Sequence, residues 1–167
     1  MNILDLPVIS RIRRNHGLEH ASLTILSLND PTLALAGISF PAGFFVLGDV
    51  DTGQLRSAVF QALNRMQNGE KHLAVHPNCG TNYVTSGVIA GLLAWLGLSG
   101  ARDRREKLDR LPLVISLVTL AFIYTRPLGP IIQEHITTSG ELTDLQIVDI
   151  FPVRLGNFCL HRVVTSG

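Results

Sequence analysis

Two histidines and a glutamate lie close together in the stretch NHGLEHA, residues 15–21. In a helix, His16 and His20 stand about one turn apart on one side, and Glu19 flanks them. Two imidazoles at this spacing can chelate one divalent ion, and a neighbouring carboxylate can act as general base for a water activated there. The order HxxEH is that of the inverzincins, the reversed form of the HExxH zinc peptidase motif. The stretch therefore predicts a zinc site with Glu19 as catalytic base.

Two histidines do not complete a metal site, and the stretch HLAVHPNCG offers further donors. His76 and Cys79 are three residues apart across a turn that contains proline, so an imidazole and a thiolate can converge on one ion. If the segment is a strand, His72 lies about 13 Å from His76, at ~3.3 Å per residue, and one ion cannot bind both. If it is a helix, this exclusion does not hold. We predict four metal ligands: His16, His20, His76 and Cys79.

The number of protein ligands on the zinc distinguishes a structural site from a catalytic one. Closed coordination by all four side chains would make the zinc structural, with Glu19 outside the coordination sphere, whereas a catalytic site keeps one position open for water. The first hypothesis is a zinc-dependent, membrane-associated hydrolase that is peptidase-like. The second is a noncatalytic membrane assembly or scaffold subunit, in which zinc ties the amino-terminal helix to the Cys79 turn. A third, noncovalent haem or chlorophyll ligation, would give visible absorbance.

The elements that must position these residues follow from the residue periodicity. We predict a helix at 10–28 with Ser10 as N-cap and Asn29-Asp30-Pro31 as its end. The β-rich runs on either side of Pro41-Ala42-Gly43 predict a hairpin. A second amphipathic helix follows at 51–67, with Asp51 or Thr52 as cap and Asn68-Gly69 as its end. Residues 71–76 alternate like a short strand.

Two long apolar runs follow. No charged residue occurs from His72 to Ala101, nor from Leu111 to Thr125. A helix needs about 20 apolar residues to cross the hydrocarbon core of a membrane. A single domain of 18.2 kDa could hardly wrap two such helices completely. We therefore predict a transmembrane hairpin rather than two buried helices of a soluble protein, with membrane lipid as its partner.

The predicted fold class is α+β. Residues 1–82 form a small metal-binding domain that carries the HxxEH and HPNCG motifs. Residues 83–133 form an inserted two-helix transmembrane hairpin with a basic loop at 101–111. Residues 134–167 form a carboxyl-terminal β segment that packs on the first domain, with two short strands around Pro152 to Gly156.

Composition and charge bear on partners and compartment. The net charge is +1 and no basic run with interleaved aromatics occurs, so nucleic acid is not an expected partner. The two cysteines, Cys79 and Cys159, are too few for a disulfide scaffold and suit one bridge, two thiols or a metal ligand. No signal peptide is expected, since RIRR arrives by residue 11.

The membrane topology receives two opposed indications. The positive-inside rule favours a cytoplasmic position for the basic loop, which would put both termini outside. A thiolate ligand at Cys79 instead favours a reducing compartment for the metal domain. We expect an integral membrane protein with a cytoplasmic metal domain, or a hairpin that does not fully cross. It could work within a membrane protein complex.

The two motifs also carry a resemblance. HGLEHA followed by HPNCGTN and then by apolar segments resembles the YqhQ-like family, bacterial membrane proteins of unknown function that are described as metal-dependent enzymes. The chain is more similar still to a smaller group of uncharacterised membrane proteins from photosynthetic and related bacteria. The similarity covers about residues 10–130. It implies His16, Glu19, His20 and Cys79 as functional positions, zinc or another metal as cofactor, and no established reaction.

Overall fold

The computed structural model describes residues 3–142, 144–155 and 158–167. The side chains of Leu155, Phe158 and Cys159 lie outside the described part, so the structure does not bear on a bridge to Cys159. The chain divides into two compact units. The first unit holds residues 1–76 and 133–167, and the second holds residues 77–132.

The first unit contains a four-stranded antiparallel sheet, which confirms the α+β class. The strands are β1 (Ala36–Phe40), β2 (Gly43–Leu47), β3 (Gln146–Leu155) and β4 (Phe158–Ser166), in the order β1-β2-β4-β3. Both predicted hairpins are present, and they join through the pairing of β2 with β4. The predicted break from Pro152 is wrong, because Pro152 to Leu155 continue β3 and pair with β4. Gly43 opens β2 with φ at +133°, and a side chain there would overlap the carbonyl of Val163. This turn therefore requires glycine.

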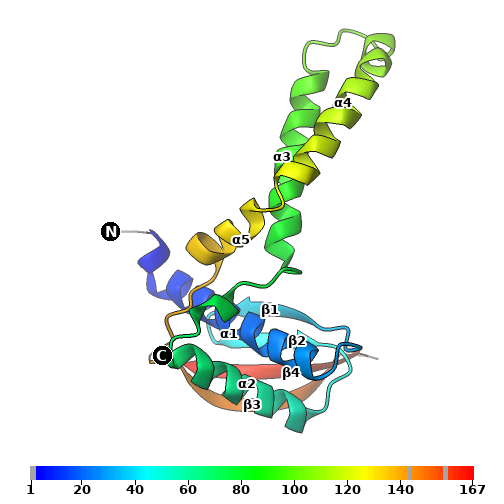
Figure 1. The fold of residues 1–167 in the computed structure, drawn as a ribbon. Coiled ribbons are helices and arrows are strands. Elements are labelled where there is room, and N and C mark those ends of the chain that lie inside the picture. Colours follow the sequence, from blue (N-terminus) through cyan, green and yellow to red (C-terminus); the bar gives the residue numbers. More distant parts are fainter. Residues whose placement is uncertain (1–2, 143, 156–157) are drawn as a thin grey trace. The chain divides into compact units, whose positions relative to one another are not determined.

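Two helices, α1 (Pro7–Asn29) and α2 (Thr52–Gln67), lie side by side across one face of this sheet (Figure 1). The predicted N-cap Ser10 is wrong. The helix begins at Pro7, because the fixed φ of proline suits the first helical position. The second cap is confirmed as Asp51, whose carboxylate accepts hydrogen bonds from the backbone N–H groups of Gly53 and Gln54.

The core of the first unit lies between these helices and the sheet. It is continuous across all of these elements, and its fully buried side chains include Leu18, Phe44, Val46, Leu55, Val59, Met66, Leu142 and Val163. The periodicity of α2 places Leu55, Val59, Leu63 and Met66 on one face, and this face is the buried one. The helix α1, which carries the HxxEH motif, is therefore fixed on two sides.

The segment after α2 is a 3₁₀ turn, η2 (Lys71–Ala74), and the predicted strand is wrong. The adjacent residues Leu73 and Ala74 are both buried, whereas neighbouring strand residues point to opposite faces. The turn packs on α1 instead of pairing with a strand. Two further short elements complete the unit: the 3₁₀ turn η1 (Ile3–Asp5) and the π-helical turn η3 (Gln133–Thr137).

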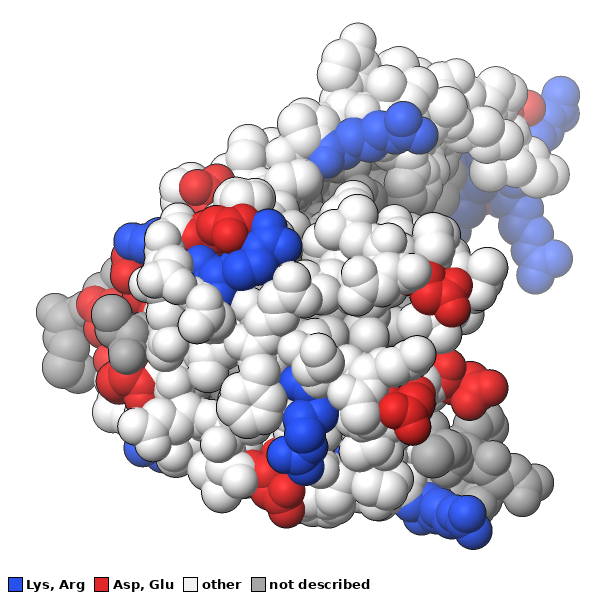
Figure 2. Space-filling model, turned by 60° about the horizontal axis from the view of Figure 1, so that its bottom comes forward, with Lys and Arg blue, Asp and Glu red and all other residues white. Residues whose placement is uncertain are grey.

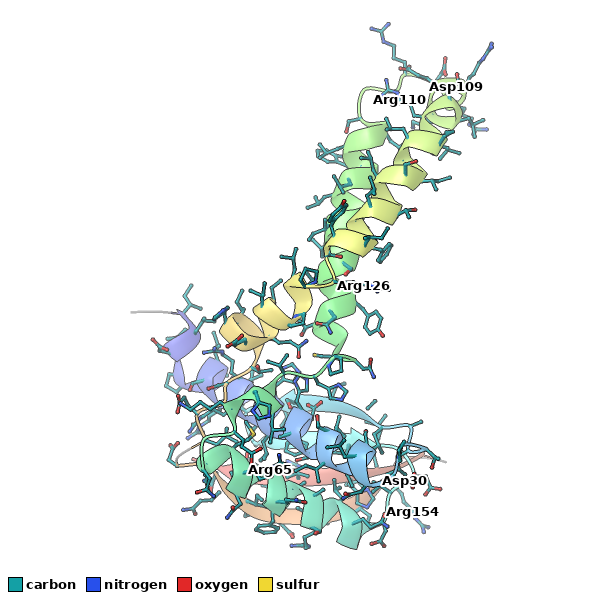
Figure 3. The ribbon with its side chains drawn as sticks, in the orientation of Figure 1. Asp30, Arg65, Asp109, Arg110, Arg126 and Arg154 are labelled. Carbon is teal, nitrogen blue, oxygen red and sulfur yellow. The ribbon has the colours of Figure 1, made fainter. Side chains whose placement is uncertain are left out.

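The second unit consists of α3 (Gly80–Leu98), α4 (Arg104–Tyr124) and the short α5 (Leu128–Ile132). The helices α3 and α4 pack along each other, with Gly97 against Val114 and a 2.8 Å hydrogen bond between the hydroxyls of Ser86 and Thr125. Asp109 and Arg110 lie near the end where the two helices are joined, and Arg126 lies just beyond the other end of α4 (Figure 3). Charged residues thus bracket the apolar part of α4.

One helix, α3, is long and apolar enough to cross a membrane. The second expected span meets that test only when α4 is joined through a sharp bend to residues 128–137. Most apolar side chains of this unit are exposed, including Val88, Leu92, Trp95, Ile115 and Ile123. By contrast, lysine and arginine side chains mix with aspartate and glutamate in small groups on the face of the molecule shown in Figure 2.

Candidate metal centre

The imidazole rings of His16 and His20 lie together on α1, with ring centroids 4.3 Å apart. Nδ1 of His16 lies 3.0 Å from the carbonyl oxygen of Thr137, and Nδ1 of His20 lies 2.7 Å from that of Ala74. A carbonyl oxygen only accepts, so each Nδ1 is the donor. In a neutral imidazole the lone pair then belongs to Nε2.

This pattern is typical of metal ligands. A ligating histidine usually donates its second ring N–H to a carbonyl or a carboxylate, which fixes the tautomer and the ring orientation. Here the two carbonyl groups come from η2 and from η3, far from α1 in sequence. In the first unit, the Nε2 atoms of His16 and His20, one helical turn apart on α1, are therefore the ring nitrogens that can bind a metal.

Cys79 supplies the third donor. The ligand atoms of His16, His20 and Cys79 all lie within 4.8 Å of one another, and the cysteine is buried. Its sulfur accepts a 3.4 Å hydrogen bond from the backbone N–H of Thr81 at the start of α3. Two imidazoles and a thiolate suit tetrahedral zinc, which holds such donors about 3.3 to 3.8 Å apart. The group could hold a metal ion after a small contraction.

The fourth predicted ligand, His76, lies beside this group. Its ring centroid is 5.8 Å from that of His20, and it is not among the three mutually close donors. Its backbone N–H donates to Oε1 of the buried Gln133 at 2.8 Å. Burial lowers the pKa of His76, and the neighbouring His20 lowers it further. His72, on η2, is exposed.

The carboxylate of Glu19 is buried against β1, with 4% of the residue exposed. It accepts a 2.6 Å hydrogen bond from the hydroxyl of Ser39, and a side chain at Gly37 would overlap it. Burial raises the pKa of Glu19, while the Ser39 hydrogen bond and His16 oppose the rise. Sequence reasoning missed Ser39 and Gly37, because no local pattern links them to a helix 20 residues away.

A model of a domain of unknown function, DUF6391, matches residues 11–150, which include every predicted ligand and Glu19. The chain belongs to the DUF6391 family. An uncharacterised protein of the cyanobacterium Picosynechococcus sp. (strain PCC 7002) is 36% identical over 140 residues. That match covers 77% of this chain and 66% of the relative, so the chain spans just under two thirds of its relative's length. No solved structure matches the chain.

These comparisons confirm a family of unknown function and a cyanobacterial relative. They name no metal, membrane or reaction for DUF6391, and the resemblance to the YqhQ-like proteins stays an expectation. The chemistry of the site therefore rests on its own geometry.

Proposed function

We propose that this DUF6391 protein is a zinc-dependent, membrane-associated hydrolase whose metal is held by His16, His20 and Cys79. One observation carries the proposal: both imidazoles donate Nδ1–H to backbone carbonyls, and their donors gather with the thiol within 4.8 Å. Three protein donors leave tetrahedral zinc one further position, as catalytic zinc sites do. His76 is close enough to act as a fourth donor only if its ring moves.

When bound, zinc would supply Lewis acidity for a substrate carbonyl. Glu19 would act as the general base, as the HxxEH order predicts. Glu19 follows His16 by three residues on the same helix. One oxygen of its carboxylate accepts a hydrogen bond from the hydroxyl of Ser39. Peptides are the substrate class that the inverzincin-like order favours.

Metal content tests the ligand set. Elemental mass spectrometry on detergent-purified protein should give about one zinc per chain in the wild type. His16→Ala, His20→Ala and Cys79→Ser should each lose it, since each removes one of three ligands. His72→Ala is the matched control, because this exposed histidine lies outside the group and should keep the metal. Zinc kept by the three ligand variants, or lost equally from the His72→Ala control, would contradict the assignment.

Glu19→Gln tests the catalytic role. Cleavage of a synthetic peptide library, followed by mass spectrometry, should fall by about 10²-fold or more in this variant, the usual range for loss of a general base. The zinc content should stay at that of the wild type, because Glu19 is not a ligand. Equal cleavage by both proteins would remove Glu19 from the chemistry.

A second candidate is the noncatalytic subunit with structural zinc. The observation in its favour is the burial of the donors, since His20 is 2% and Cys79 is 7% exposed, together with the Ser39 contact of Glu19. In that case metal binding adds to the free energy of folding. Removal of zinc by a chelator should then lower the melting temperature strongly, and no library peptide should be cleaved.

The membrane association rests on the second unit. Its exposed apolar helices would be covered by lipid, and α3 has the length of a span. We place the metal-binding unit on the cytoplasmic side, because a thiolate ligand survives better in a reducing compartment. The same exposed faces are suited to a protein partner within a membrane complex.

A further inference from the structure

A concave site lies in the first unit, apart from the candidate metal centre. It is a cavity of about 1020 Å³ between the start of α1, the turn η2 and the segment that follows η3. None of the three metal donors lines it. Its volume lies just above the range of about 300–1,000 Å³ that is typical of small-molecule sites.

The charged residues of this cavity differ in how far they are exposed to solvent. Arg13 and Arg14 come from adjacent positions on α1, and only 13% of the Arg14 side chain is exposed. Asp5, Glu134, Glu141 and Asp144 also line the cavity, and all four residues are exposed. The Arg14 side chain is therefore shielded from solvent, whereas the carboxylate residues of the cavity are open to it.

The two guanidinium groups have donors to spare. In the part of the chain that the structure describes, Nε of Arg13 and Nε of Arg14 are buried and have no hydrogen-bond partner. Arg13 donates otherwise to the carbonyl of His135, and Arg14 to the carboxylate of Asp144. Each guanidinium group carries five N–H donors, so terminal N–H groups remain beyond these contacts, and an oxyanion in the cavity would pair with them through charge-assisted N–H···O bonds.

The exposed carboxylates of the cavity favour a positively charged group on the ligand. Lys71 pairs with Glu141 and Arg14 pairs with Asp144, whereas Asp5 and Glu134 form no ion pair with any other described residue. From these charges we infer that the cavity binds a small zwitterion, with its oxyanion on Arg13 and Arg14 and its ammonium group toward Glu134. A phosphate or a carboxylate could supply the oxyanion.

Isothermal titration of the full chain in detergent tests this site. Phosphoethanolamine and β-alanine present an ammonium group two carbons from a phosphate or a carboxylate, and ethanolamine lacks the oxyanion. We expect one or both zwitterions to bind more tightly than ethanolamine, and the stronger one identifies the oxyanion. No heat with either zwitterion, or equal affinity for ethanolamine, would overturn the inference.

Three variants locate the two ends of the ligand. Arg13→Gln should weaken the zwitterion by about tenfold or more, the effect of losing a charge-assisted hydrogen bond. Glu134→Gln changes an exposed residue, so it should fold and should weaken the zwitterion while leaving the affinity for inorganic phosphate unchanged. Arg11→Gln is the control, because this arginine of the same helix bonds Gly167 and does not line the cavity. Equal weakening by Arg11→Gln and Arg13→Gln would overturn the site.

Discussion

Gly37 leaves the space on β1 that the Glu19 carboxylate occupies. Any side chain at this position would overlap the carboxyl group, so Gly37→Ala forces the helix or the strand to shift. Overpacking of this kind costs about 1–3 kcal/mol in the free energy of unfolding, measured by chemical denaturation in detergent. In Gly91→Ala, the added methyl would meet no atom within 4 Å, so stability should stay within about 0.5 kcal/mol or rise. Equal stability of Gly37→Ala and wild type would mean that Glu19 does not lie against β1.

His161 is a second buried side chain with a measurable consequence. It is 2% exposed, and its Nε2 lies 2.9 Å from the hydroxyl of Thr52. Burial lowers the pKa of His161, and Asp51 opposes this shift. The unfolded chain therefore takes up a proton near pH 6.5 before the folded protein does, so stability should fall as the pH drops below about 6.5.

The free energy of unfolding, followed from pH 8 to pH 5, checks this prediction. His161→Asn has no titrating ring and should show a shallower loss of stability over that range. The difference in slope between the two proteins isolates the contribution of His161 from those of other titrating groups. Parallel curves would show that His161 titrates alike in both states.

The candidate ligands on α1 could be found from the sequence, but the groups that hold their rings in place could not. The i, i+4 spacing of His16 and His20 predicts that their rings lie together on one side of the helix, because helix geometry is local, and their ring centroids are 4.3 Å apart. The carbonyls that orient the two rings belong to Thr137 and Ala74, 121 and 54 residues away. Their positions depend on how η2 and η3 pack on α1, and no local pattern encodes that packing.

At the scale of elements, a buried asparagine joins α1 to the sheet. Asn15 is fully buried, donates to the carbonyl of Phe40 at 2.9 Å, and accepts from the hydroxyl of Thr165 at 2.7 Å. Asn15→Ala would remove both contacts and leave the hydroxyl of the buried Thr165 without this acceptor, at a cost of about 1–3 kcal/mol. Thermal or chemical unfolding measures this loss of stability. The control is Asn64→Ala at an exposed position on α2, whose stability should stay within about 0.5 kcal/mol of the wild type. If Asn15→Ala is as stable as the control, the hydrogen bonds of Asn15 do not fix α1 on the sheet.

Element types were easier to predict than their pairing. The hairpin around Pro41 and the cap at Asp51 follow from turn and cap chemistry, which a few adjacent residues determine. In the sequence, Leu145 and Ile147 share the apolar face of a two-residue alternation that Asp149 interrupts. The structure gives the cause, because the register of β3 shifts between Ile147 and Asp149. An irregularity of this kind moves later side chains to the other face, which a strict two-residue period cannot anticipate. The junction of β2 with β4 joins segments more than 110 residues apart and carries no local signal.

At the scale of the whole molecule, the two units differ in what covers their apolar residues. The first unit buries its own core between helices and sheet. In the second unit, the described buried positions on α3 and α4 are few, and large apolar side chains face outward. The charge-free part of α4, Leu111 to Thr125, would be about 22 Å long at 1.5 Å per residue, against about 30 Å of hydrocarbon. This length explains why α4 alone does not meet the requirement for a span.

Extraction of membranes with alkaline carbonate decides what covers the second unit. If lipid covers α3, the wild-type protein should stay in the membrane pellet. A double variant, Leu92→Lys with Trp95→Lys, should move toward the supernatant, since each central lysine costs about 2.5–3.5 kcal/mol of insertion free energy. Phe60→Lys changes an exposed apolar residue of α2 in the first unit and should leave the partition unchanged. Release of the wild type by carbonate would contradict insertion, and the outward apolar side chains of α3 and α4 would then need a protein partner to cover them, because a surface of this kind is not stable in water.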